Sequence, residues 1–160
     1  MNKKFFIIPL LIIIFDQITK LYIRTEFAIG DSIKLIGNIV KITYIENQGA
    51  AFGMKLGNQS INRILLASIS FVAIFFIIYL IKNSETKIQL IAFHLILGGA
   101  FGNFIDRAFR GTVTDFVDCD FPNFLAQIYG STRWPIFNVA DSAIFIAFIL
   151  LIFEIVFEKK

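Results

Sequence analysis

The stretch FNVADSAIFIAFILLIFEIVF, residues 137–157, places an asparagine and an aspartate at the mouth of a long apolar segment. Asn138 and Asp141 open the stretch, and the residues that follow them are almost all apolar. A carboxylate at the end of a membrane helix is costly, which makes Asp141 a candidate functional residue. A second aspartate, Asp115 in the run GTVTDF, would form a carboxylate pair with Asp141 if the fold brings the two together.

The composition is that of an integral membrane protein. The chain has 160 residues, of which 57% are hydrophobic, and its mean hydropathy is +0.75. Charged residues make up 17%, below the roughly 25% of a soluble domain. The net charge of +3, without a basic stripe interleaved with aromatics, indicates contact with lipid headgroups rather than nucleic acid. Cys119 and His94 are the only residues of their kinds, which excludes an internal disulfide or CxxC site and argues against a histidine-rich zinc site.

Four segments are long and apolar enough to be membrane helices, which need about 20 mostly apolar residues. We predict these helices at about 5–23, 64–81, 88–105 and 139–157, within a single domain of residues 1–160. The first segment resembles a signal peptide, but no small-x-small cleavage site follows it and charged residues stand where its apolar core should end. We therefore interpret it as a membrane span.

Lysines near the predicted spans set an orientation. With four spans they fall on one side, which the positive-inside rule assigns to the cytoplasm. Both termini are then cytoplasmic, and the two long connecting segments lie outside, although these also carry basic residues. The lysines concerned are Lys3, Lys4, Lys82, Lys87, Lys159 and Lys160.

The first outer segment has strand character. Residues 32–38 and 39–45 alternate and are rich in β-branched side chains, with a Gly-Asn turn signal between them, which predicts a hairpin or small sheet. The following run, ENQGAAFG at 46–53, is typical of a tight loop whose backbone can approach a partner closely. The outer β region therefore covers about 32–53. The second outer segment, 118–133, is predicted to be irregular.

Polar residues of three spans fall at the same depth. Asp16 lies about 16 Å along the first helix from its apolar start, and Lys20, one turn later, can pair with it. On the third span, Gly99, Asn103 and Arg107 share one face. Gly98 and Gly102 form a GxxxG motif that permits close helix contact.

The fourth span begins at this same outer depth with Asn138 and Asp141. The inner halves of the helices contain little that is polar except His94 and Glu154. A transport path would need polar groups at both depths, so this distribution argues for a site at the outer leaflet.

Each candidate also has a simpler role. Asp141 could only complement the helix dipole, and Asn138 could only cap the helix. Asp115, taken alone, could be a solvated loop residue. For Asp16 and Lys20 we favour an internal ion pair that orients the first helix.

The remaining polar residues are interpreted as structural. We expect Asp106 to anchor its helix at the headgroups, and Asp118 and Asp120 to be exposed loop acids. Calcium binding by these acids would need the glycine and terminal glutamate of an EF-hand, which are missing. His94 is expected to pack between helices, and Glu154 to be interfacial.

Two aspartates held close together cannot both ionise easily, so they share a proton. The ionised partner can take a proton from an attacking water while the protonated partner donates to the carbonyl oxygen of an amide, as in aspartic proteases. This chemistry needs neither a metal nor a cofactor. Four polar residues could hold the substrate backbone: Asn47, Asn103, Arg107 and Asn138.

Five motifs together resemble the bacterial lipoprotein signal peptidase (signal peptidase II) family over nearly the whole chain. They occur in the family's order, and together they are highly specific. The motifs are DQITK at 16–20, NQGAAFG at 47–53, GGAFGNFIDR at 98–107, VTDF at 113–116 and FNVADSA at 137–143.

The resemblance implies an inner-membrane aspartic endopeptidase with four transmembrane helices, a small extracytoplasmic β-sheet cradle and a short extracytoplasmic loop or helix. Such enzymes cleave diacylglyceryl-modified prolipoproteins before the lipidated cysteine, and antibiotics such as globomycin inhibit them. By match of motif, Asp115 and Asp141 are the expected catalytic dyad. The supporting residues would be Asn47, Gly99, Asn103, Arg107, Asn138, Asp16 and Lys20.

We expect a monomer that contacts membrane lipids and its prolipoprotein substrate. Two alternatives come from other classes of protein. One is a small transporter with a proton relay of Asp16, Asp106 and Asp141, and the other is a membrane scaffold without catalytic activity. A relay would extend into the cytoplasmic half, and a scaffold would not need paired carboxylates.

Overall fold

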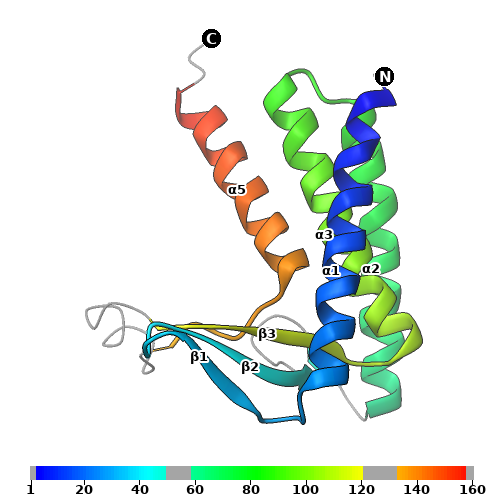
Figure 1. Cartoon of the computed structure of the whole chain (residues 1–160). Coiled ribbons are helices and arrows are strands. Elements are labelled where there is room, and N and C mark those ends of the chain that lie inside the picture. The colour runs from blue at the N-terminus through cyan, green and yellow to red at the C-terminus, as the bar shows by residue number, and fades with distance from the viewer. Residues whose placement is uncertain (1–2, 50–58, 121–132, 158–160) are drawn as a thin grey trace.

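The computed structural model describes residues 3–49, 59–120 and 133–157. The helices run along the length of the molecule, and the sheet lies at one of its ends; the start of α1, the α2–α3 turn and the end of α5 lie at the other end (Figure 1). The helices are η1 (Lys3–Phe6), α1 (Ile7–Glu26), α2 (Gln59–Lys82), α3 (Lys87–Phe109) and α5 (Val139–Phe157). The strands are β1 (Ser32–Ile36), β2 (Val40–Asn47) and β3 (Val113–Cys119).

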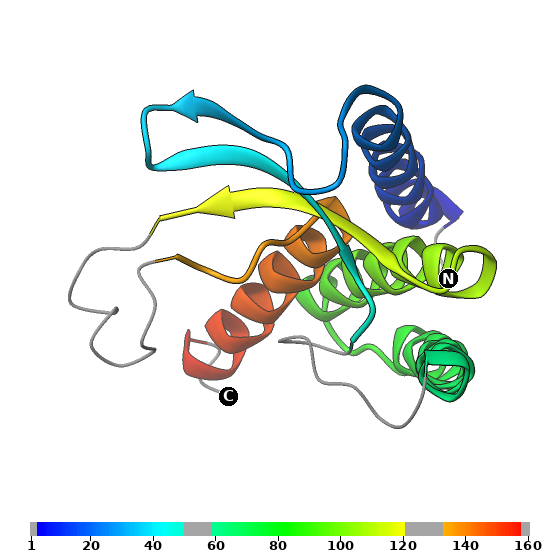
Figure 2. The same ribbon diagram turned by 90° about the horizontal axis from the view of Figure 1, so that it is seen from below.

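Helix α3 is the central helix of the bundle, because α1, α2 and α5 all pack against it (Figure 2). An apolar cluster joins α2 to α3 and consists of Ile74, Ile77, Ile81 and Leu97. Where α3 begins, Thr86 caps it by accepting a hydrogen bond from the Gln89 backbone N–H at 3.1 Å. The chain leaves α3 through Gly111, whose positive φ of 82° suits glycine.

The burial pattern is the reverse of that of a soluble protein. On α1, Asp16 and Lys20 are completely buried, while Phe15 and Ile18 are about 60% exposed (62% and 59%). Apolar side chains also cover the outward faces of the other helices. Charged groups inside and apolar groups outside are what a hydrocarbon environment favours.

Within the described residues, three helical segments are long and apolar enough to cross a membrane: Arg63–Lys82, Lys87–Phe109 and Val139–Phe157. Helix α1 is not among them, and its sequence carries Asp16, Lys20 and Arg24 between apolar residues. The prediction of a mainly helical protein with a small sheet is confirmed. Four membrane crossings remain a prediction.

The small sheet is antiparallel, with the strand order β1-β2-β3. Strands β1 and β2 form the predicted hairpin, in which Ser32 pairs with Thr43. The third strand was not predicted: Ile45 of β2 pairs with Asp115 of β3. The expectation that 118–133 is irregular is wrong at its start, because residues 118 and 119 complete β3 by pairing with β2.

Parts of the predicted connecting segments lie outside the described residues. These are the glycine-bracketed loop from residue 50 onward, the middle of the second outer segment (121–132) and the C-terminal lysines at 159 and 160.

Two glycines of α3 allow α1 to approach closely, as the GxxxG motif predicts. A Cβ atom at Gly98 would lie 2.8 Å from the Ile12 Cβ. One at Gly102 would lie 2.6 Å from Asp16 Oδ2 and 3.2 Å from the Ala140 Cβ. Gly102 therefore stands where α1, α3 and α5 converge on a buried carboxylate.

Gly102→Ala should destabilise the protein by about 1–3 kcal/mol, the usual effect of overpacking. The added methyl group must displace the Asp16 carboxylate and lies tightly against the Ala140 side chain of α5. Thermal unfolding of purified protein in detergent measures the effect. Gly37→Asn is the matched control, because Gly37 lies in a turn with nothing within 4 Å of an added Cβ and asparagine tolerates its φ of +53°. Equal melting temperatures for the two variants would contradict the close contact.

Candidate active site

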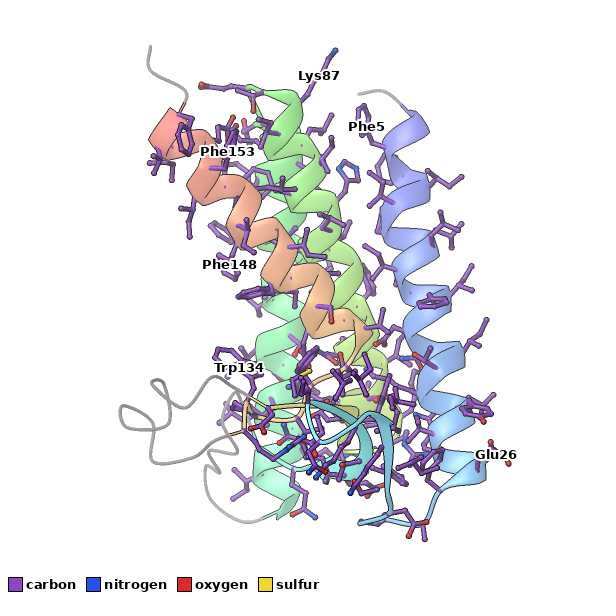
Figure 3. All side chains as sticks on the ribbon, turned by 60° about the vertical axis from the view of Figure 1, so that its left-hand side comes forward. Phe5, Glu26, Lys87, Trp134, Phe148 and Phe153 are labelled. Carbon is purple, nitrogen blue, oxygen red and sulfur yellow. The ribbon has the colours of Figure 1, made fainter. Side chains whose placement is uncertain are left out.

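Asp115 and Asp141 come from different elements and meet where the sheet joins the helix bundle. Asp115 lies on β3 and is 2% exposed, while Asp141 lies in the first turn of α5 and is half-buried. The two carboxylates are close enough for the charge of Asp141 to affect the titration of Asp115. Polar side chains gather around this end of the helices (Figure 3).

Asn138 connects the two aspartates. Its side-chain Nδ2 donates to Asp115 Oδ1 at 2.7 Å, and its Oδ1 accepts the Asp141 backbone N–H at 2.9 Å. The other Asp115 oxygen, Oδ2, accepts a hydrogen bond from Asn47 Nδ2 at 3.0 Å. Asn47 is the last residue of β2, so strand pairing brings it to Asp115.

Asn138 and Asp141 also cap α5 reciprocally. Asn138 Oδ1 accepts the Asp141 backbone N–H, and Asp141 Oδ2 accepts the Asn138 backbone N–H at 3.2 Å. This arrangement is a capping box. The simpler roles considered for these residues, a cap and a partner of the helix dipole, are therefore present, and the same atoms also belong to the carboxylate site.

Asn103 of α3 holds Asp141 from the other side. Its Nδ2 donates to Asp141 Oδ1 at 2.7 Å, and its Oδ1 accepts from Asn138 Nδ2 at 3.0 Å and from Lys20 Nζ at 2.9 Å. Because two donors point at the oxygen, the amide is oriented with its NH₂ group toward Asp141.

Lys20 is buried between two carboxylates. Its Nζ lies 2.9 Å from Asp16 Oδ2 and 3.4 Å from Asp106 Oδ2, and the side chains of all three are at most 1% exposed. The remaining Asp16 oxygen, Oδ1, accepts the Ala140 backbone N–H at 2.9 Å. The ion pair favoured for Asp16 and Lys20 is confirmed, and it extends from α1 to both α3 and α5.

Asp106 does not anchor its helix at the headgroups, so that expectation is wrong. The side chain is 1% exposed, and its Oδ2 accepts the Thr114 backbone N–H at 3.0 Å, which ties α3 to β3. Its Oδ1 lies 3.6 Å from Arg24 Nη1. A signal for this role was present in the sequence, since Asp106 follows Gly102 by four residues and Asn103 by three, on the same helix face.

Arg107 and Gly99, the remaining predicted residues of α3, lie beside this network. The Arg107 guanidinium is half-buried and interacts electrostatically with Asp141, Asp115 and Asp106, and its Nε is buried without a hydrogen-bond partner in the described part of the chain. Gly99 packs directly against the backbone of α5 at Ala140, so any side chain there would displace the start of that helix.

The pKa of Asp115 is raised to about 7, chiefly because burial penalises the carboxylate and also because the charge of Asp141 repels it. Hydrogen bonds from Asn47 and Asn138 oppose this shift. A carboxyl group with such a pKa can hold a proton near neutral pH and release it within the physiological range.

Two further expectations about acidic residues are wrong. Asp118 is not an exposed loop acid: it lies on β3, is 6% exposed, and accepts hydrogen bonds from Arg133 Nε at 2.5 Å and Thr43 Oγ1 at 2.8 Å. Asp120 is half-buried. Glu154, expected to be interfacial, lies near the end of α5, is 5% exposed and accepts a hydrogen bond from the Thr86 hydroxyl, while its depth in the membrane stays a prediction.

His94 packs between helices as expected, with its ring against Phe5 and Phe6. Across the described ranges, no three His, Cys, Asp or Glu side chains are grouped so that they could hold a metal ion.

Residues 8–157 match the model of the signal peptidase (SPase) II family, Peptidase_A8. A lipoprotein signal peptidase of Francisella tularensis subsp. novicida (strain U112) is 42% identical over 160 residues, covering 98% of this chain and 94% of that protein. One from Wigglesworthia glossinidia brevipalpis is 37% identical over 154 residues, covering 96% and 95%.

Two solved structures, both described as bacterial membrane enzymes, have the same fold. The first has a TM-score of 0.80 and 32% identity and covers 100% of this chain and 95% of its own. The second has a TM-score of 0.79 and 33% identity and covers 99% and 96%.

Lys20→Met should destabilise the protein by about 3–5 kcal/mol, because it leaves the carboxylates of Asp16 and Asp106 buried without their ammonium partner. Thermal unfolding and the yield of folded protein measure the loss. Lys34→Met is the matched control, since Lys34 is an exposed residue of β1.

Asp16→Asn combined with Lys20→Met should recover part of the lost stability, because it removes one of the unpaired charges. Unchanged thermal stability in Lys20→Met would show that the buried ion pair does not hold the bundle together.

Proposed function

The chain belongs to the signal peptidase II family, and on that premise we propose that it is an aspartic endopeptidase that removes signal peptides from prolipoproteins. The observation that carries this proposal is the link that Asn138 makes between Asp115 and Asp141 in a largely buried site. Family membership favours this activity over the transporter and scaffold alternatives.

The surroundings of the two aspartates suggest different protonation states. Asp141 accepts an amide N–H from Asn103 and a backbone N–H at the positive end of the α5 dipole, and both stabilise a negative charge. Asp115 is the more deeply buried, and its raised pKa favours the neutral form. In the resting enzyme Asp141 is therefore the ionised partner and Asp115 carries the shared proton.

The first step adds water to the scissile carbonyl. The water oxygen attacks the carbonyl carbon while Asp141 takes a proton from the water, and Asp115 gives its proton to the carbonyl oxygen. The product is a neutral tetrahedral diol. Asp141 is now protonated and Asp115 ionised.

The second step breaks the carbon–nitrogen bond. Asp141 donates its proton to the leaving nitrogen, while Asp115 removes a proton from one hydroxyl group of the diol. A carboxylic acid and an amine leave, and both aspartates return to their starting states, so no metal or cofactor takes part.

The neighbouring residues bind and position. Asn47, Asn103 and Asn138 hold the two carboxylates. We propose that the Arg107 guanidinium, which interacts electrostatically with both aspartates, contacts the substrate backbone. Gly99 keeps α5 close to α3. Asp16 and Lys20 support Asn103 and the first turn of α5 from behind.

We further propose that α1 is a fourth membrane span. Its 20 residues extend about 30 Å, the thickness of the hydrocarbon core, and its charged side chains Asp16 and Lys20 are buried against the bundle. The protein then lies in the bacterial inner membrane with both termini in the cytoplasm and its active site at the outer leaflet.

This depth suits a diacylglyceryl-modified prolipoprotein, whose acyl chains lie in the bilayer and whose scissile bond, just before the lipidated cysteine, lies near the headgroups. We propose that the enzyme acts as a monomer. Inhibitors such as globomycin would occupy the same site as the substrate.

Asp115→Asn and Asp141→Asn should each lower turnover of a diacylglyceryl prolipoprotein at least about a hundredfold, since each removes a proton donor or acceptor. Cleavage by purified, folded protein measures the loss. Asp31→Asn, at an exposed turn beside β1, should keep full activity. Full activity of either dyad variant would contradict the mechanism.

Activity should fall as the pH rises above about 7, because Asp115 then loses the proton that it must donate. The slope should approach tenfold per pH unit in kcat/KM, which reports ionisations of the free enzyme. A pH profile from 5.5 to 9 measures it. A kcat/KM that stays constant to pH 9 would show that Asp115 is not the proton donor.

A stability measurement gives an independent check of this protonation. The folded-state pKa of Asp115 lies above its unfolded value of 3.8, so its contribution to stability is fully present below that value and is lost as the pH rises through about 7. The wild-type melting temperature should therefore fall more than that of Asp115→Asn between pH 5.5 and 8.5. Parallel curves for the two proteins would contradict the raised pKa.

A further inference from the structure

A second polar site lies at the end of the bundle away from the sheet. Here α2, α3 and α5 enclose a groove of about 410 Å³, which we call the inner groove. Its polar lining consists of Asn83, Glu85, Gln89 and Glu154, and Phe93 and Leu151 are among its apolar residues. The carboxylate site does not use any of these residues.

Acidic groups give the inner groove its charge. Glu154 is 5% exposed and held by the Thr86 hydroxyl, while Glu85 is exposed at the α2–α3 turn. Among the described residues that line the groove, none is basic. The nearby Lys82 lines a neighbouring hollow instead, and Lys87 is exposed. A buried carboxylate in an otherwise apolar helix end favours a cationic partner.

One face of α3 connects the inner groove to the two aspartates. Gln89, Phe93, Ile96, Ala100, Asn103 and Arg107 follow one another at intervals of three or four residues, so they lie on one side of the helix. Gln89 and Phe93 line the groove, whereas Asn103 binds Asp141 and Arg107 interacts with both aspartates. Between these ends the face is apolar and half-buried.

The length of this face matches that of a signal peptide. Gln89 and Asn103 are separated by about 21 Å of helix. Signal peptides have a basic n-region followed by 7–15 apolar residues, which span about 10–22 Å as a helix. If the scissile bond lies at the aspartates and the apolar region follows α3, the basic residues reach the inner groove.

We propose that the inner groove binds the ammonium or guanidinium groups of the substrate's n-region through Glu154 and Glu85. This inference rests on the proposed function, which supplies a signal peptide as the bound chain. The groove acts in binding and lies about 20 Å along α5 from Asp141, so it affects substrate affinity and leaves the chemical step unchanged.

The test uses a synthetic diacylglyceryl prolipoprotein peptide with two lysines in its n-region and a matched peptide with two glutamines there. Both are cleaved by the full-length protein in dodecyl maltoside micelles, which carry no charge. For the wild type, KM should be about fivefold higher for the glutamine peptide, with kcat unchanged, since a partly exposed ion pair contributes up to about 1 kcal/mol.

The variant Glu85→Gln/Glu154→Gln should give the two peptides equal KM values, because the partner of the charge is gone. Glutamine at 154 retains an oxygen that can accept the Thr86 hydroxyl, and thermal unfolding checks the fold. Glu26→Gln, an exposed acid at the sheet end of α1, is the matched control and should behave as wild type. A charge dependence of KM that persists in the double variant overturns the proposal.

Glu85→Lys provides a second test at an exposed position, where misfolding is not expected. This charge reversal should raise KM for the lysine peptide and lower it for a peptide with two glutamates in its n-region. No change with either peptide overturns the proposal. A further outcome also overturns the proposal. If KM does not depend on the n-region charge, and added phosphatidylethanolamine changes KM for the wild type but not for the double variant, the groove is a site for a lipid amine.

Binding without cleavage separates this inference from the proposed function. Anisotropy of a fluorescent signal peptide, measured with the wild type and the double variant, needs no catalysis. If the wild type, but not the double variant, binds the lysine peptide more tightly and neither substrate is cleaved, the binding role of the inner groove is supported and the proposed peptidase activity is rejected. If both substrates are cleaved and the affinity of the wild type does not depend on the charge of the n-region, the peptidase activity is supported and the binding role of the inner groove is rejected.

Discussion

The ammonium group of Lys20, buried among carboxylates, joins the elements on which the site depends. It contacts Asp16 on its own helix and Asp106 and Asn103 on α3, and Asp16 in turn binds the first turn of α5. Buried charges are costly in an apolar medium unless they are paired, so these helices gain stability only when they meet in this arrangement. The close approach of Asp16 to Gly102 fixes how α1 packs, because a side chain at that position would collide with the carboxylate.

The same network determines the chemistry of the two aspartates. Lys20 and Asn138 both donate to the Asn103 oxygen, which turns the Asn103 amide toward Asp141. Asp141 thus receives donors that stabilise its negative charge, while Asp115, on strand β3, is more deeply buried and its raised pKa favours the neutral form. An asymmetric pair results from two identical side chains, because their surroundings differ in burial and in the helix dipole.

The polar groups of the inner groove lie at the opposite end of the bundle from the two aspartates, and our proposal gives them a role in substrate binding. Glu154 is buried in an apolar helix and lies on the α5 face that packs toward α3, with Ala140, Ala143 and Ala147. A protein that binds a signal peptide along its length has a use for polar groups at both ends of the apolar region. If the proposal holds, the acidic groove, the apolar face of α3 and the two aspartates follow one another in the same order as the basic region, the apolar region and the scissile bond of the peptide.

Much of the fold could be predicted because its signals are local. Apolar runs of membrane length, a turn signal between alternating β-branched segments, and the Asp16–Lys20 and Asn138–Asp141 spacings each act within a few residues, so the sequence alone indicated the helices, the hairpin, the ion pair and the cap. The resemblance to a family supplied the pairing of Asp115 with Asp141.

The tertiary structure alone decided how distant segments pair and which charges they bury. Strand β3 forms because β2 offers it a partner, and that pairing brings Asn47 to Asp115. Asp106 was expected at the headgroups, Asp118 in an exposed loop and Glu154 at the membrane interface, and all three side chains are buried in the protein. Their partners Arg24, Arg133 and Thr86 lie 15 to 82 positions away in the sequence. Whether a charge is solvated or buried depends on contacts between such distant residues, and no local pattern encodes them.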